Sequence, residues 1–178
     1  PANDRILHSC PPPARQATLC STPRGGSPGA ETKTHAASDD FAIWQGRYSP
    51  DGRWILFNAQ SRKVLGTSVL HIVPVTGGAW TRVTAETLWA DKARWSPDGR
   101  TIYFISNRNG AFFDVWGIHF DPATGPTVGE EFRVTNLDNP GRHLYASAAA
   151  DLGVSQSRLV VPIVETTGSI WLLGSPKK

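Results

Sequence analysis

The 178-residue sequence lacks several features that would place it in a particular class of protein. It has no apolar stretch long enough to cross a bilayer as a helix, so we expect no membrane span. Its 18 Lys and Arg residues are scattered rather than clustered, which argues against a nucleic-acid partner although the net charge is +3. The length suits a single domain.

Short catalytic motifs are also missing. The sequence contains neither the G-x-S-x-G of a hydrolase nucleophile nor an H-E-x-x-H zinc motif. The only cysteines, Cys10 and Cys20, have no nearby histidines or paired carboxylates, so they do not indicate a metal site. They either form a disulfide in an oxidising compartment or remain unpaired thiols in a flexible segment, and we favour the thiols.

Residues 1–38 differ in composition from the rest of the chain. They are rich in Pro, Gly, Ser, Ala and Thr and contain few large apolar residues. Such a segment buries too little apolar surface to offset the entropy lost on ordering. We therefore predict a disordered leader or linker over 1–38.

From residue 39 onward, β-branched and aromatic residues occur in short bursts bounded by Gly, Pro, Asn or Asp, which is typical of strands. No window shows a helical period. In the burst at 101–106 both alternating sets of positions are apolar, which indicates a strand covered on both faces. The pattern predicts an all-β fold of several small stacked sheets.

The pentapeptide SPDGR begins at Ser49 and again at Ser96, 47 residues later. Repeats of about 40–50 residues in an all-strand chain are typical of four-stranded propeller blades. A third, degraded unit has Ser155–Arg158 in place of the pentapeptide. We predict a partial β-propeller of about two and a half blades, over residues 39–85, 86–137 and 138–174.

The repeated pentapeptide has the composition of a tight turn. Proline presets φ, the aspartate accepts hydrogen bonds from nearby backbone, and the glycine adopts a left-handed conformation. We favour a structural corner over a cation site. The turn residues are Ser49, Pro50, Asp51 and Gly52 in the first unit and Ser96, Pro97, Asp98 and Gly99 in the second.

These residues resemble the TolB-type β-propeller repeat, a relative of the WD repeat. The match is fullest in the second unit, where Trp95 and SPDGR are followed by S-N-R-N-G at 106–110 and D-V-W at 114–116. The ending resembles the C-terminus of large bacterial proteins in which a propeller follows a regulatory domain. The resemblance implies a scaffold that binds proteins or peptides, from the C-terminal part of a bacterial regulatory or envelope protein. We expect the bacterial periplasm rather than the cytoplasm.

A closed propeller needs four or more blades, and exposed sheet edges promote association. We therefore expect either self-association or a fragment of a longer propeller; a fragment without a function of its own is a further alternative.

Two sets of residues are candidates for function. An aromatic and basic binding surface near the inner strands would use Trp44, Arg47, Trp89, Asp91, Lys92 and Arg94, with Trp95 beside them. The alternative is an ester or lactone hydrolase that uses calcium, in which Asp91, His71 and His119 are the catalytic candidates. We expect His71 and His119 to occupy comparable places in the third strands of two blades, and Asp39 and Asp40 precede an inner strand. We favour binding over catalysis, and we predict no obligatory cofactor.

Overall fold

The computed structural model of the chain describes residues 4–10, 17–27, 30–85, 89–108, 112–137, 139–144, 151–169 and 174. These residues form 15 β-strands and no helix, which confirms the predicted all-β fold. Within this described part, therefore, nothing has the length and helical character of a membrane-crossing segment.

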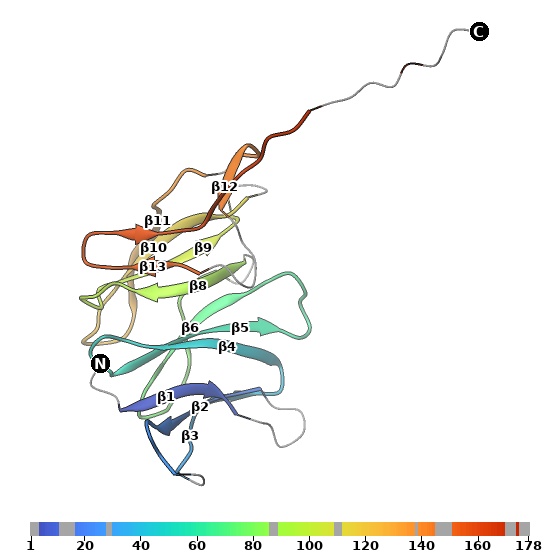
Figure 1. Ribbon diagram of the computed structural model, residues 1–178. Coiled ribbons are helices and arrows are strands. Elements are labelled where there is room, and N and C mark those ends of the chain that lie inside the picture. The colour runs from blue at the N-terminus through green and yellow to red at the C-terminus, as the bar shows by residue number, and fades with distance from the viewer. Residues whose placement is uncertain are drawn as a thin grey trace.

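Two antiparallel four-stranded sheets form the centre of the molecule. Blade one contains β4 (Phe41–Tyr48), β5 (Trp54–Ser61), β6 (Val69–Pro74) and β7 (Thr81–Arg82). Blade two contains β8 (Ala90–Trp95), β9 (Thr101–Ser106), β10 (Asp114–Phe120) and β11 (Thr127–Arg133). In both, the strands lie side by side in chain order, and Figure 1 shows the sheets stacked along the molecule.

The stack explains why the second strand of each blade is apolar at consecutive positions. Side chains alternate between the faces of a sheet, so a sheet with neighbours on both sides needs apolar residues on both faces. On β5, Leu56 packs in the core between the two blades, whereas Ile55 and Phe57 pack in the core on the other side. On β9, Phe104 belongs to the first of these cores and Ile105 to a third one.

The predicted disorder of residues 1–38 is wrong for the part that the structure describes. This part forms a three-stranded antiparallel sheet of β1 (Arg5–Ser9), β2 (Ala17–Pro23) and β3 (Lys33–Ser38). Its few apolar residues suffice because they pack on blade one: Leu19, which is only 3% exposed, shares a core with Ile43 and Phe57.

A disulfide joins Cys10, which directly follows β1, to Cys20 in the middle of β2, with Cα atoms 5.7 Å apart. The interpretation of these cysteines as unpaired thiols is therefore wrong as well. Composition alone missed the bond, because nothing in the spacing of two cysteines tells whether strands will bring them together.

The C-terminal strands form two small pairs against blade two. They are β12 (Arg142–Leu144) with β15 (Ile163–Glu165), and β13 (Gly153–Val154) with β14 (Leu159–Val160). Leu144 and Leu152 pack against Ile105 and Val115 of blade two. Of the third blade predicted over 138–174, residues 138, 145–150 and 170–173 lie outside the described residues.

Candidate functional site

The first SPDGR segment is the corner that joins β4 to β5. The Ser49 hydroxyl donates to Asp51 Oδ1 at 2.6 Å and accepts from the Trp54 N–H at 2.9 Å. The Arg53 N–H also donates to Asp51 Oδ1, at 3.1 Å. Gly52 has φ of 73°, in the left-handed region that favours glycine. The aspartate is thus bound to the turn itself.

The second SPDGR segment repeats this geometry between β8 and β9. Ser96 Oγ donates to Asp98 Oδ1 at 2.6 Å and accepts from the Thr101 N–H at 2.9 Å. The Arg100 N–H donates to Asp98 Oδ1 at 3.0 Å, and Gly99 has φ of 71°. The hydrogen bond from Ser96, followed by that from Arg100, holds the pKa of Asp98 below its usual value.

The inner strands of the two blades carry the same irregularity. The pairing of β4 with β5 shifts register between Trp44 and Arg47, and the pairing of β8 with β9 shifts between Asp91 and Arg94. Inside each bulge one residue that is not glycine has φ of 55°: Gln45 in one strand and Lys92 in the other. A bulge re-aims the side chains that follow it, so Arg47 and Arg94 occupy equivalent positions on neighbouring strands.

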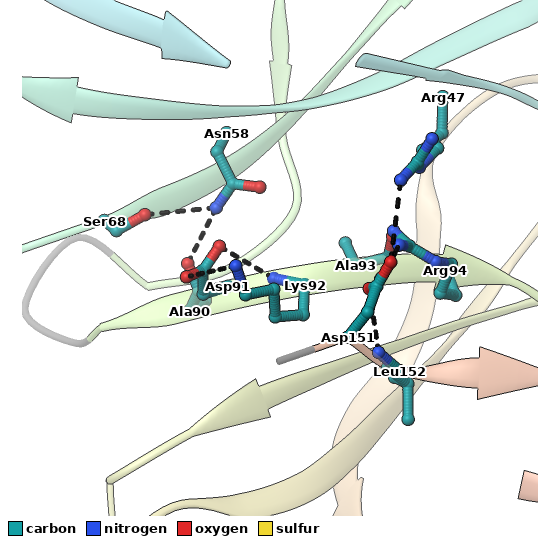
Figure 2. Close-up of polar contacts among 10 residues, drawn as sticks. All are labelled: Arg47, Asn58, Ser68, Ala90, Asp91, Lys92, Ala93, Arg94, Asp151 and Leu152. Atoms are coloured by element: carbon teal, nitrogen blue, oxygen red, sulfur yellow. Dashed lines mark hydrogen bonds and ion pairs between the residues drawn. The ribbon is translucent and has the colours of Figure 1, made fainter. Parts of the chain in front are cut away.

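Those two arginines converge on one carboxylate, as Figure 2 shows. Arg94 donates to both oxygens of Asp151 and lies in an ion pair with it, while Arg47 Nη2 is 3.9 Å from Asp151 Oδ2. The Leu152 N–H donates to Asp151 Oδ1 at 2.8 Å. The described residues thus supply one carboxylate to two guanidinium groups, leaving a net positive charge.

Solvent reaches this arginine cluster, which we define as Arg47, Arg94 and Asp151. The side chains of Arg47 and Asp151 are 47% and 57% exposed, whereas that of Arg94 is 16% exposed. Partial burial, followed by repulsion from Arg94, lowers the pKa of Arg47, and Asp151 opposes that shift. The cluster is therefore a cationic group that a further anion can reach.

Asp91 and Lys92 form a separate, more buried pair beside the cluster (Figure 2). Asp91 Oδ1 accepts the Lys92 N–H at 2.8 Å, and the Lys92 ammonium lies 3.8 Å from Asp91 Oδ2. Nearby, the Asn58 amide donates to Ser68 Oγ at 3.1 Å and to the Ala90 carbonyl at 2.8 Å, which ties blade one to blade two. Asp91 therefore contacts Lys92, the residue inside the bulge of its own strand.

The tryptophans predicted for binding are distributed around the inner strands rather than gathered in one exposed face. Trp44 is half-buried opposite Asn58, and Trp89 is half-buried where it bridges Ser68. Trp95 is buried in the core between the blades, and its indole N–H donates to the Arg47 carbonyl at 3.4 Å. Of the predicted surface, the structure brings together Arg47 with Arg94, and Asp91 with Lys92.

His71 and His119 do not occupy equivalent positions. His71 pairs with Phe57, whereas His119 pairs with Thr101. Applying the 47-residue repeat, the counterpart of Phe57 is Phe104 and not Thr101. His71 stacks on Phe57 with ring centroids 5.9 Å apart, and His119 is exposed beside Phe132. The structure therefore does not join these histidines with Asp91 in one site.

The remaining acidic candidates lie elsewhere. Asp39 and Asp40 are exposed, and Asp40 forms an ion pair with Lys63 at 2.7 Å. Among the described residues, no group of three or more His, Cys, Asp or Glu side chains is placed to hold a metal ion.

Sequence reasoning missed Asp151 and one cleft. Asp151 precedes the degraded third corner, and only an alignment of the third inner strand with the first two would have placed it beside Arg94. The cleft, of about 560 Å³, lies between the second SPDGR corner and the hairpin of β13 and β14. Tyr103, Asp98 and Arg158 are among its lining residues, and nothing in the sequence marks it.

Comparison with known proteins places the chain by structure alone, because no protein-family model and no curated protein matches it. TolB from Acinetobacter baumannii is similar over 89% of this chain and 37% of its own, with 17% identity and a TM-score of 0.52. The tricorn protease is similar over 85% of this chain and 17% of its own, with 12% identity and a TM-score of 0.56.

A third match is the β-propeller domain of the Trilobed protease from Pyrococcus furiosus, described as having an open velcro topology. It is similar over 89% of this chain and 48% of its own, with 13% identity and a TM-score of 0.50. The chain thus spans less than half the length of each of these proteins. At such low identity the likeness concerns the fold. The chain has a TolB-like β-propeller fold, in which two full blades are flanked by shorter sheets.

Proposed function

We propose that the chain is a binding scaffold that takes a protein or peptide at the inner strands of its blades. The observation that carries this proposal is the arginine cluster, in which two equivalent arginines share one carboxylate. Arginine is enriched among residues that dominate binding energy, because its planar fork forms several directed hydrogen bonds. The corners, by contrast, use their aspartates within the turn.

The test is selection of binders from a random peptide library on the purified chain, followed by affinity measurement. Arg47→Ala should weaken the selected peptides by about tenfold or more, as for an arginine at the centre of an interface. Arg53→Ala is the matched control, because Arg53 is also exposed and paired with an aspartate, at 2.7 Å, but lies in a corner. Peptides that bind both variants equally well would contradict a site at the inner strands.

The hydrolase alternative keeps weaker support. Three of the similar solved structures are described as proteases or a hydrolase, yet this chain covers only 17% to 48% of those chains. Turnover of a panel of esters and lactones, lost with chelator and with Asp91→Ala or His119→Ala, would favour it over the scaffold. Calcium dependence stays a prediction that the same assay tests.

Two further parts of the proposal concern location and assembly. Disulfides persist in oxidising compartments, so the Cys10–Cys20 bond supports the bacterial periplasm. Self-association through the open ends of the stack stays a prediction, which sedimentation velocity tests: a concentration-independent monomer would contradict it.

A further inference from the structure

The arginine cluster has the form of a carboxylate site that is filled from within the chain. Arg94 engages both oxygens of Asp151, and Arg47 lies at ion-pair distance on the same side. A single nitrogen of Arg94, Nη2, donates to both oxygens, while its Nη1 donates to the Ala93 carbonyl at 2.8 Å. Charge-assisted hydrogen bonds of this kind are the means by which arginine binds acids. Asp151 comes from the segment just before β13, whereas both arginines come from the repeated blades.

The two arginines are placed by the repeat, and the acid is not. Each arginine follows the same bulge on an inner strand, 47 residues apart. Asp151 precedes the short strand β13, where the corner sequence has degraded and the pairing with β14 covers only two residues. The cationic pair is thus built into the two best-formed sheets, and its acidic partner into the smallest.

The internal acid is also held loosely. Its side chain is 57% exposed, and besides the arginines the N–H of the next residue, Leu152, donates to it. The pair of Arg47 with Asp151 is exposed on both sides and contributes little stability, because solvent screens the charges, whereas Arg94 is mostly buried. One unit of positive charge remains after Asp151 is counted, so an entering carboxylate would not meet a neutral site.

We propose that Asp151 stands in for a ligand, and that Arg47 and Arg94 bind the carboxylate of a peptide when it displaces Asp151. The carboxylate can belong to the C-terminus of the peptide or to an acidic side chain, since both present the same two oxygens. This inference rests on the scaffold function and names its ligand chemistry. An internal competitor reduces apparent affinity by the fraction of time it occupies the site.

The experiment measures the affinity of four probes for the full chain by NMR titration of arginine side-chain signals. The probes are N-acetyl-trialanine with a free carboxylate, its C-terminal amide, N-acetyl-Ala-Glu-Ala amide, and inorganic phosphate at matched ionic strength. The acids should bind, and the uncharged amide should not. Binding of one acid or both identifies the terminal or side-chain source, and either result supports the proposal.

Two kinds of variant test the displacement. Asp151→Asn should tighten binding of the acids by about tenfold, because the competing charge is gone. Asp151→Ser should do the same, and it serves if the asparagine variant misfolds. Arg47→Gln and Arg94→Gln should each weaken binding at least tenfold. The matched control is the corner pair, in which Asp51→Asn and Arg53→Gln should leave binding unchanged.

Three outcomes would overturn the proposal. One is equal binding of the acid and its amide; another is phosphate competing as well as the acids, which describes an unselective anion site. The third is unchanged affinity in both Asp151 variants. In all three cases, library peptides that still lose affinity on Arg47→Ala would leave the scaffold function standing, so the two failures are distinguishable.

Discussion

The two ends of the stack are built in opposite ways, although both flank the same pair of blades. The N-terminal sheet carries no trace of the repeat, yet it has three strands, a disulfide and fully buried side chains such as Cys20, 1% exposed. The C-terminal strands carry a degraded corner at Ser155–Arg158, yet β13 and β14 pair over two residues, and Val160 is 65% exposed.

The difference shows that the SPDGR motif indicates where a corner forms, whereas the burial of apolar side chains depends on the neighbouring sheet. SPDGR specifies a corner through its hydrogen bonds, which are local to five or six residues. Whether a sheet is well covered depends on its contact with the neighbouring blade, as in the packing of Leu19 close to Gly46, where an added Cβ would lie 2.6 Å from the leucine. A sheet without the motif can therefore be better packed than one that retains part of it.

The largest effect that tests this comparison is expected from Leu19→Ala. Loss of a buried leucine leaves a cavity, so unfolding free energy should fall by about 2–5 kcal/mol. Leu65→Ala, at a leucine 85% exposed, is the matched control and should change it by less than about 0.5 kcal/mol. Urea unfolding measures both. A small effect at Leu19 would mean that the N-terminal sheet is not part of the cooperative unit.

A somewhat smaller effect is expected from removing the disulfide. The double change Cys10→Ser and Cys20→Ser should cost about 2–3 kcal/mol, because the unfolded chain regains the freedom that the bond removes. Hydrogen exchange should increase in β1 and β2 and change little in blade two. Uniform loss of protection across both blades would contradict a local role for the bond. Reduction of the wild-type protein without substitution is the control.

Much of the fold was predictable from residues that act locally. The corner needs Ser, Asp and Gly at fixed spacing, and the apolar runs at 54–57 and 102–105 reflect sheets covered on both faces. The N-terminal sheet was not predictable, because it is ordered by contacts with residues far along the chain. Leu19 is an isolated apolar residue in sequence, and only the proximity of Gly46 and Phe57 makes it part of a core.

The site was predictable in part for the same reason. Arg47 and Arg94 were predicted as part of an aromatic and basic surface near the inner strands, and their equivalence became visible only in the register of the two blades. Asp151 was not found, because it lies 57 residues from Arg94 and no motif surrounds it. The prediction that His71 and His119 are equivalent was wrong, because a similar position in sequence does not fix the register of a strand. His119 lies three residues beyond the true counterpart of His71, which puts it on the other face of its sheet.

The smallest expected effect concerns the corners. Each SPDGR corner contains an aspartate, whereas the degraded corner at Ser155–Arg158 does not, so only the SPDGR corners should respond to low pH. In the folded state the pKa of Asp98 is lowered by its hydrogen bonds from Ser96 and Arg100. The same direction holds for Asp51, where bonds from Ser49 and Arg53 outweigh the opposing effect of burial. A lowered pKa stabilises the fold above the unfolded value of about 3.9 and loses that contribution as pH falls through the folded value.

Asp98→Asn should therefore lower the unfolding free energy by about 1 kcal/mol at pH 7, since hydrogen bonds to a charged group are replaced by neutral ones. The gap between wild type and variant should close as pH falls below about 4. Gln156→Ala in the degraded corner, where the described turn bonds run between Ser155 and Arg158, should show no such pH-dependent gap. Urea midpoints from pH 7 to pH 3 measure this. A gap as large at pH 3 as at pH 7 would show that the aspartate acts through its shape rather than through its charge.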